Sequence, residues 1–299
     1  MQIQEARIVL LGAGGQLGRR LQAQAMSLGI ALQAFDRHCL NIQDGASLAC
    51  RLRECSPHII INAAGYTQVD LAEQAVETAF AVNAAGPGHL AAVAQDLGAV
   101  LIQVSTDYVF DGHKSAPYVE TDEPNPLGVY GASKLAGEAE VQARCAKHLI
   151  LRTAWLFDPA GSNFVRTVLR LAHSRSSLRI VADQWGSPTC AQDLAGAVLS
   201  MACEALQPDF VDWGLYHYAG SPSVSWFEFA EAIIQAAWQQ GLLAYQPALF
   251  PIPSAEYACA ARRPLNSRLD CSKIAARFGI PPSDWRRALQ DLRPYLTPV

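Results

Sequence analysis

The sequence predicts an α/β protein of the Rossmann type, a doubly wound parallel sheet with a smaller C-terminal substrate-binding lobe. Short apolar runs alternate with segments of helical periodicity, a glycine loop joins the first run to the first helix, and the alternation loosens after residue 155. Of the 299 residues 51% are hydrophobic, enough for a sizeable core. We expect a dinucleotide-binding domain over residues 1–155, its sheet completed by parts of 178–219, and a mainly substrate-binding lobe over 156–299.

The first half of the chain alternates strands with helices. The expected strands, rich in β-branched residues and leucine, are residues 8–11, 31–35, 58–61, 100–104 and 148–153. The expected helices, with apolar residues three and four apart, are residues 16–27, 45–54, 71–81, 87–97 and 130–146. Strands separated by helices imply right-handed crossovers and a parallel sheet covered on both faces.

The second half is less regular, as a lobe that grips a substrate would be. The expected helices there are residues 164–171, 193–202 and 226–239, and one further strand is expected at 214–218. A proline-containing segment at 184–189 and a basic segment at 261–268 complete this part of the chain.

Composition narrows the classes of partner. The formal net charge is −4 and Lys and Arg are scattered, so we expect no nucleic-acid partner. No run of about 18 apolar residues is present and the N-terminus lacks a signal-peptide pattern, so we expect no membrane association. Eight dispersed cysteines without a C-x-x-C pair are typical of reduced thiols, and seven dispersed histidines indicate no metal site. These features favour a cytoplasmic protein.

The glycine loop is the first functional motif. Gly12, Gly15 and Gly18 stand between the first strand and the first helix, which is the arrangement of a dinucleotide-binding turn. The first glycine permits the tight turn, the second admits a pyrophosphate, and the helix N-terminus adds positive potential. Gln16 and Leu17 are expected to flank the diphosphate. Glycines also serve ordinary turns, so the loop needs a second observation.

The second observation is Asp36 at the end of the second predicted strand. An acidic side chain about 20 residues past the loop accepts hydrogen bonds from the adenosine ribose, which favours NADH. Arg37 follows at once, and its guanidinium could accommodate the 2′-phosphate of NADPH. The cofactor is therefore NADPH or NADH.

Tyr130 and Lys134 form the candidate catalytic pair. Residues four apart on a helix share one face, so one site can hold both side chains. Reduction of a carbonyl needs a hydride on carbon and a proton on oxygen, and a phenol near a cation can donate that proton. Thr106 ends a predicted strand, where ligands of open α/β folds collect, and its hydroxyl can reach a substrate oxygen.

With these motifs in place, the chain resembles the extended short-chain dehydrogenase/reductases and, within them, the dTDP-4-dehydrorhamnose reductases. The likeness covers nearly the whole chain. The matching segments are residues 62–70, 105–110, 129–138, 151–155, 183–189 and 261–269.

The resemblance implies both a reaction and roles for individual residues. Hydride would pass to C4 of dTDP-4-dehydro-L-rhamnose and give dTDP-L-rhamnose for cell-surface polysaccharide. Tyr130 would protonate the sugar O4, Lys134 would hold the nicotinamide ribose, and Thr106 would tune the tyrosine. Besides Tyr130, the residues implied to contact the sugar are Thr106, Asp107 and Trp155, and those implied to border the cofactor are Ala64, Gly65 and Tyr66.

The sequence departs from related enzymes in two ways, one of which bears on the reaction and the other on the assembly. Related nucleotide-sugar 4,6-dehydratases place a Glu where this chain has Tyr108, so dehydration is disfavoured. Some reductases of the family form dimers through a magnesium ion held by acidic side chains, at positions that look like Arg20 and Gln192 here. We therefore expect a monomer or weak homodimer without a metal.

Two alternatives remain open from sequence. The chain could be a reductase or epimerase of another nucleotide sugar, since the sugar lobe is the least readable part. It could also be a non-catalytic regulatory relative, because a fold does not fix a function. The intact Thr106, Tyr130 and Lys134 argue against the latter.

Overall fold

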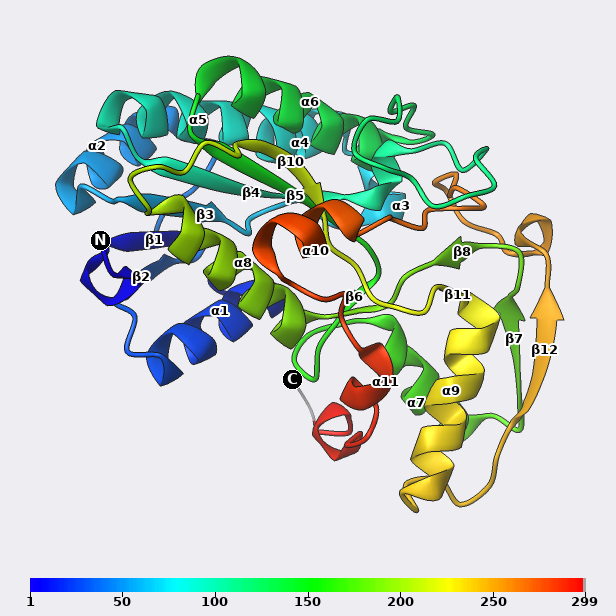
Figure 1. Ribbon diagram of the computed structural model, residues 1–299. Helices are drawn as coiled ribbons and strands as arrows, with labels where there is room; N and C mark the ends of the chain where they lie inside the picture. Colours follow the sequence, from blue (N-terminus) through cyan, green and yellow to red (C-terminus); the bar gives the residue numbers. More distant parts are fainter. Residues whose placement is uncertain (298–299) are drawn as a thin grey trace.

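The computed structural model describes residues 1–297 and contains a six-stranded parallel sheet in the order β10-β5-β4-β3-β1-β2 (Figure 1). Its strands are β1 (Ile8–Leu11), β2 (Leu32–Phe35), β3 (Ile59–Asn62), β4 (Val100–Thr106), β5 (His148–Thr153) and β10 (Gly214–His217). Every neighbouring pair is parallel. The predicted fold class is confirmed.

Both faces of the sheet are covered by helices. Strand β1 shows this directly: Ile8 and Leu10 are buried in one apolar cluster, and Val9 and Leu11 are buried in another. The helices that contribute to the first cluster are α1 (Gln16–Ser27), α8 (Ala191–Ala205) and α10 (Ser272–Phe278). Those that contribute to the second are α2 (Gly45–Cys55), α5 (Gly86–Leu97) and α6 (Val129–Arg144). The C-terminal half of the chain thus supplies β10, α8 and α10 to the sheet.

The helix predicted over residues 71–81 is wrong in its extent. The chain forms a short α3 (Val69–Ala72), breaks, and resumes as α4 (Val76–Phe80). A π-helical turn (Ala81–Ala85) then leads directly into α5, where a separate helix had been expected. Pro87 has no N–H to offer the carbonyl of Asn83, so the regular α-helical bond cannot form at this point and the wider turn takes its place.

The smaller C-terminal region has its own apolar core, which includes Phe229 and Trp285. Its main elements are α7 (Phe164–Ser174), β7 (Ser177–Val181), α9 (Trp226–Gln239), β12 (Ala248–Ile252) and α11 (Trp285–Ala288). Strand β7 pairs with β12 in a parallel ribbon of its own and does not join the main sheet. The sequence prediction missed β12, whose run is interrupted by Pro251.

Short elements connect the sheet to this region. They are β6 (Leu156–Phe157), which pairs with β9 (Thr189–Cys190), and β8 (Trp185–Gly186), which pairs with β11 (Val224–Ser225). Single 3-10 turns occur at Ile3–Glu5, Asp107–Val109, Ser254–Glu256 and Arg293–Tyr295.

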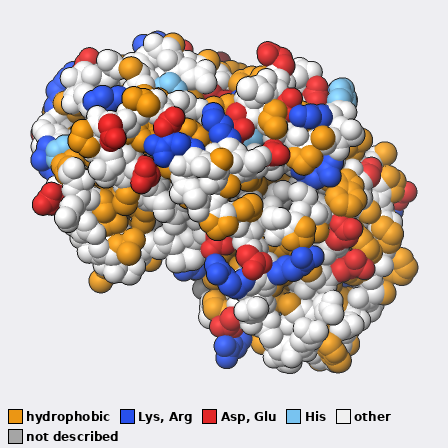
Figure 2. Space-filling view, viewed as in Figure 1, with side chains coloured by type: hydrophobic (Ala, Val, Ile, Leu, Met, Phe, Trp, Pro, Cys, Tyr) orange, Lys and Arg blue, Asp and Glu red, His pale blue; other side chains and the backbone are white. Residues whose placement is uncertain are grey.

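Basic and acidic side chains are interspersed over the face seen in Figure 2. Over residues 1–297, no helix combines the length and apolarity that a bilayer crossing requires.

Candidate active site

The glycine loop makes a tight turn between β1 and α1. Gly12 has φ +85°, a left-handed conformation that suits glycine, and its N–H donates to the carbonyl of Phe35 at 3.0 Å. A Cβ on Gly12 would lie 2.5 Å from the backbone nitrogen of Ala64. A Cβ on Gly18 would lie 2.2 Å from the carbonyl oxygen of Gly12. Both positions require glycine because the loop, the end of β3 and the first turn of α1 approach one another so closely.

A cavity of about 700 Å³ opens beside this loop. Its lining includes seven of the residues predicted to bind the cofactor, namely Gly12, Gly15, Asp36, Arg37, Ala64, Gly65 and Tyr66. Gly15 occupies the N-cap of α1, and among residues 1–297 no side chain caps that helix. The N–H groups of its first turn are therefore open to an anion, and the helix dipole favours one there. The size and the donors of the cavity fit a dinucleotide.

Asp36 lies at the rim of the cavity, at the end of β2. Its Oδ1 accepts the N–H groups of Cys39 and His38, each at 2.9 Å. These two hydrogen bonds lower the pKa of the carboxyl group below its ordinary value. An ionised carboxylate at the rim can accept from ribose hydroxyls, and the exposed Arg37 next to it lines the same cavity.

The far wall of the cavity is held by Asn83, which sequence reasoning missed. Its Oδ1 accepts the N–H of Tyr66 at 2.8 Å, and its Nδ2 donates to the carbonyl of Tyr66 at 3.0 Å. The same Nδ2 donates to the hydroxyl of Ser133 in α6 at 3.0 Å. Asn83 is buried in the π-helical turn and so joins the cavity wall to the helix that carries Tyr130. The sequence shows here only a single polar residue within an alanine-rich run, which gives no signal for this role.

Lys134 projects from α6 toward the cavity. Its Nζ donates to the carbonyl of Val104 at 2.6 Å and lies 3.9 Å from the point where a Cβ on Gly65 would stand. Burial lowers the pKa of this ammonium to about 8, although the carboxylate of Glu138 one turn away raises it. The group is therefore charged at neutral pH and sits against a residue that lines the cavity.

Tyr130 stands at the first turn of the same helix. Burial raises the pKa of its phenol to about 12, the neighbouring Thr106 hydroxyl lowers it, and the nearby Asp107 raises it. The phenol is thus fully protonated at neutral pH. The ring of Tyr108 contacts it edge to face, with the centroids 6.0 Å apart. Burial also raises the pKa of the Tyr108 phenol.

Thr106 is the last residue of β4, and Asp107 follows it directly. The hydroxyl of Thr106 donates to Oδ1 of Asp107 at 3.1 Å and accepts the N–H of Tyr108 at 3.2 Å. Burial raises the pKa of Asp107 to about 7, while the nearby hydroxyl groups of Ser267 and Thr106 lower it. Its Oδ2 is buried and finds no partner among residues 1–297. This oxygen can bond a polar group of a ligand placed beside Tyr130.

Trp155 has φ +44°, which is strained for a residue with a Cβ. Its ring stacks on that of Trp226, with the centroids 3.4 Å apart and the planes within 5° of parallel. Its indole also lies against Gly186, where a Cβ would come within 2.3 Å of the ring. Trp226 and Gly186 therefore fix the orientation of Trp155. Sequence reasoning identified Trp155 and missed Trp226 and Gly186, because only tertiary packing brings these two residues into contact with the Trp155 ring.

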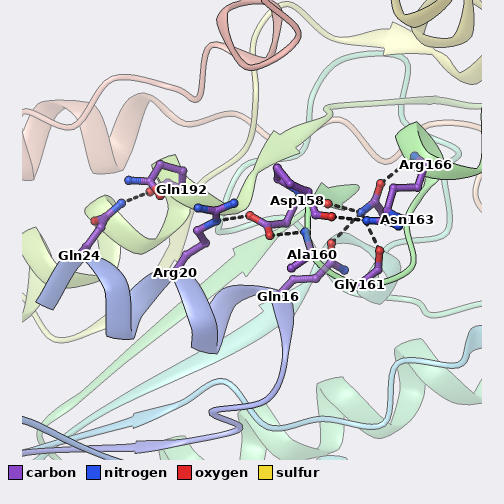
Figure 3. A network of polar contacts seen from close by, with 10 residues as sticks. Gln16, Arg20, Gln24, Asp158, Ala160, Gly161, Asn163, Arg166 and Gln192 are labelled. Atoms are coloured by element: carbon purple, nitrogen blue, oxygen red, sulfur yellow. Dashed lines mark hydrogen bonds and ion pairs between the residues drawn. The ribbon is translucent and has the colours of Figure 1, made fainter. Parts of the chain in front are cut away.

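The side chains of three predicted cofactor residues have structural contacts of their own. The side chain of Leu17 is buried in the apolar core, so it is the backbone N–H of Leu17, in the first turn of α1, that is available to a diphosphate. Gly18 allows α1 to pack against the turn. The side-chain amide of Gln16 is directed at the loop before α7 (Figure 3).

Arg20 and Gln192 stand at the two positions where the family resemblance places the acidic ligands of a bridging magnesium ion, and neither side chain is acidic. The guanidinium of Arg20 pairs with the carboxylate of Asp158, and the carbonyl of Gln192 accepts a hydrogen bond from the amide of Gln24 at 2.5 Å (Figure 3). Within the described residues, no group of three or more His, Cys, Asp or Glu is placed to hold a metal ion.

Comparison with known proteins places the chain among full-length relatives. The family model described as RmlD substrate binding domain matches residues 6–296. The dTDP-4-dehydrorhamnose reductase of Aggregatibacter actinomycetemcomitans is 44% identical over 291 residues, which cover 97% of this chain and 99% of that protein. The protein of that name from Escherichia coli K12 is 40% identical and covers 93% of this chain and 94% of its own length.

Solved structures give the same result. The dTDP-4-dehydrorhamnose reductase of Clostridium acetobutylicum superposes with a TM-score of 0.88 at 35% identity, over 95% of this chain and 96% of that one. The Bacillus anthracis protein of that name, determined in complex with NADP, also gives a TM-score of 0.88, at 36% identity over 95% of this chain and 97% of its own.

Proposed function

The chain belongs to the RmlD family of dTDP-4-dehydrorhamnose reductases, and from this premise we propose a mechanism for it. In this mechanism the residues described above reduce the C4 keto group of dTDP-4-dehydro-L-rhamnose to give dTDP-L-rhamnose. It is an NAD(P)-dependent oxidoreductase of dTDP-rhamnose biosynthesis, a route to cell-surface polysaccharide. The observation that carries the proposed mechanism is the half-buried, protonated phenol of Tyr130 on the helix whose Lys134 reaches the wall of the dinucleotide cavity.

The residues around the glycine loop would hold the cofactor. The turn at Gly12 and the uncapped start of α1 would bind its diphosphate, and Asp36 and Arg37 would receive the adenosine ribose. Ala64, Gly65 and Tyr66 would form the opposite wall. When bound, the reduced nicotinamide supplies the hydride that adds to the carbonyl carbon. Because Asp36 suits a free 2′-hydroxyl and Arg37 suits a 2′-phosphate, both NADPH and NADH are accommodated.

Tyr130 would donate the proton that the sugar O4 needs as it becomes an alcohol. A phenol with a pKa of about 12 keeps its proton until negative charge develops on a neighbouring oxygen, and then transfers it within the site. The hydroxyl of Thr106 would bond the same sugar oxygen and would orient the phenol of Tyr130. Lys134, charged at neutral pH, would hold the nicotinamide ribose and stabilise the phenolate that remains after the transfer.

The sugar would lie between β4 and Trp155. Asp107 offers an unpartnered Oδ2 to its hydroxyl groups, and Trp155 offers a fixed aromatic face. Residues 156–299 would mainly form the lobe that binds the sugar nucleotide. Tyr108, with a raised pKa and an edge-to-face contact with Tyr130, cannot serve as the acid/base group that a dehydration needs.

The ion pair of Arg20 and the charge of the ligands support proposals for the assembly and the location of the protein. With the guanidinium of Arg20 already bound to Asp158, the chain would act as a monomer or weak homodimer without a bridging metal. The proposed location is the cytoplasm, because the sugar nucleotide and the dinucleotide are highly charged and do not cross a bilayer unaided.

The test is NAD(P)H oxidation with freshly prepared dTDP-4-dehydro-L-rhamnose. Tyr130→Phe should lower turnover by about 10² to 10⁴-fold, because it removes positioned acid catalysis. Its affinity for the dinucleotide, measured by fluorescence, should persist because the cavity is unchanged. Tyr118→Phe, which removes another buried phenol, is the matched control and should keep turnover. Unchanged turnover in Tyr130→Phe would refute the mechanism, and reduction of a different 4-keto sugar alone would favour another substrate.

A further inference from the structure

The segment that carries Trp155 continues into a contact with α1. After the two residues of β6 comes Asp158, whose side chain is 1% exposed. Its Oδ1 accepts the N–H of Ala160 at 2.8 Å, and its Oδ2 accepts from Nε of Arg20 (Figure 3). Arg20 belongs to the helix whose first turn faces the dinucleotide cavity. One carboxylate therefore links the segment after Trp155 to the cofactor helix.

A second link lies one turn earlier on the same helix. The amide of Gln16 donates to the carbonyl of Ser162 at 3.4 Å and accepts from Nδ2 of Asn163 at 3.1 Å (Figure 3). That Nδ2 also donates to the carbonyl of Asp158 at 2.6 Å. Gly161, with φ +90°, would place a Cβ 3.1 Å from Cγ of Gln16, so the two segments are in close contact.

These interactions form one unit, which we call the inter-lobe contact and define as Gln16, Arg20, Asp158 and Asn163. Gln16 and Arg20 are four residues apart and share a face of α1. Asn163 caps α7 by accepting the N–H of Arg166 at 3.2 Å, so the contact also reaches the smaller C-terminal region. The side chain of Asp158 is 1% exposed and that of Arg20 is 30% exposed, so water screens this ion pair from the Arg20 side alone.

The other side of Trp155 is fixed independently. Its carbonyl accepts the N–H of Thr189 at 3.1 Å, and its ring stacks on Trp226. The segment over residues 155–158 is thus anchored to the sugar side at one end and to the cofactor helix at the other.

We infer that Arg20 and Asp158 are positioning residues for the reduction: through this contact they set the distance between the sugar carbonyl, held by the Trp155 side, and the nicotinamide, held by the α1 side. This inference rests on the proposed function. Hydride transfer needs the reacting atoms within about 3 to 3.5 Å, and a displacement of about 1 Å can cost about 10²-fold in rate. Loss of the contact should therefore slow the hydride step while each ligand still finds its own binding residues.

The experiment compares Asp158→Asn and Arg20→Met with the wild type and with Gln24→Ala. The asparagine keeps an acceptor for Ala160 and loses the charge opposite Arg20. Gln24→Ala removes another hydrogen bond between α1 and the C-terminal half, to Gln192, without touching the inter-lobe contact (Figure 3). Arg20→Lys tests rescue, because an ammonium can still pair with the buried carboxylate. All assays run well below the Tm of each variant.

Asp158→Asn and Arg20→Met should each lower kcat about tenfold or more, and the double variant should be no slower than the worse single one. The isotope effect from deuterated NADPH should rise above the wild-type value, because hydride transfer becomes rate-limiting. The Kd for NADPH and the Kd for dTDP, measured by calorimetry, should each stay within about twofold. Gln24→Ala should keep the wild-type kcat, and Arg20→Lys should recover most of it.

The inference is overturned if both variants lower only the Tm and keep the wild-type kcat and isotope effect, or if the two substitutions act additively. In that case the wild type still reduces the keto sugar and the proposed function stands. A wild type that does not oxidise NADPH with any 4-keto sugar nucleotide refutes the proposed function, and the inference falls with it.

Discussion

Asp107→Asn should remove a pH-dependent contribution to the stability of the folded protein. Burial raises the pKa of this carboxyl from 3.8 to about 7, so the folded state holds a proton that the unfolded chain releases near pH 4. The contribution is fully present below pH 3.8 and is lost as the pH rises through about 7. Asparagine has nearly the same shape, does not titrate, and can still accept from Thr106.

The size of the effect follows from the shift. At 1.36 kcal/mol per pH unit, the protonated carboxyl favours the folded state by about 2.7 kcal/mol at pH 5 and by about 0.1 kcal/mol at pH 8. The free energy of unfolding of the wild type minus that of Asp107→Asn should therefore fall by about 2.6 kcal/mol between these two pH values.

Urea denaturation followed by circular dichroism at pH 5, 6, 7 and 8 measures this difference. Comparing the two proteins at each pH cancels the titration of the other carboxyl groups. A difference that stays flat over this range would show that the carboxyl titrates normally, and the reasoning from burial would fail. A difference that rises with pH would reverse its sign and exclude a buried neutral acid.

Three further predictions concern the cofactor side of the site. NADPH affinity should fall as the pH rises through about 8, because the Lys134 ammonium loses its proton there while the Tyr130 phenol keeps its own to about pH 12; Lys134→Met should show a flat profile when Kd is measured from pH 6.5 to 9.5. Asp36→Ala should weaken NADH more than NADPH in a titration of both dinucleotides, because its carboxylate would bond the free 2′-hydroxyl; an equal loss would remove Asp36 from that role. Gly18→Ala should lower the Tm and the affinity for both dinucleotides, because a Cβ 2.2 Å from the carbonyl oxygen of Gly12 must push α1 away from the loop; a variant with wild-type Tm and Kd would contradict the close packing.

Much of the sheet and of the catalytic pair was predictable because both depend on local sequence. An apolar run of four or five residues forms a buried strand wherever helices cover both faces, and the glycine loop fixes the turn at Gly12. Tyr130 and Lys134 share one helix face because they are four residues apart, whatever packs around them. The resemblance to a reductase family rested on such local segments.

Other parts of the site depend on residues far apart in the chain. Asn83 reaches Tyr66 from the π-helical turn, and Trp226 stacks on Trp155 across more than 70 residues. The pairing of β7 with β12 likewise has no local signal.

The sequence by itself determined the doubly wound fold, the glycine turn after β1 and the helix face that Tyr130 and Lys134 share, since each follows from spacing within a few residues. Only the tertiary structure decided which side chains are buried. Burial, in turn, sets the pKa of Lys134 near 8 and that of Asp107 near 7, and it directs Gln16 and Arg20 toward the loop before α7. The physical reason is that desolvation and ion pairing depend on every element packed around a group, and spacing along the chain does not record that packing.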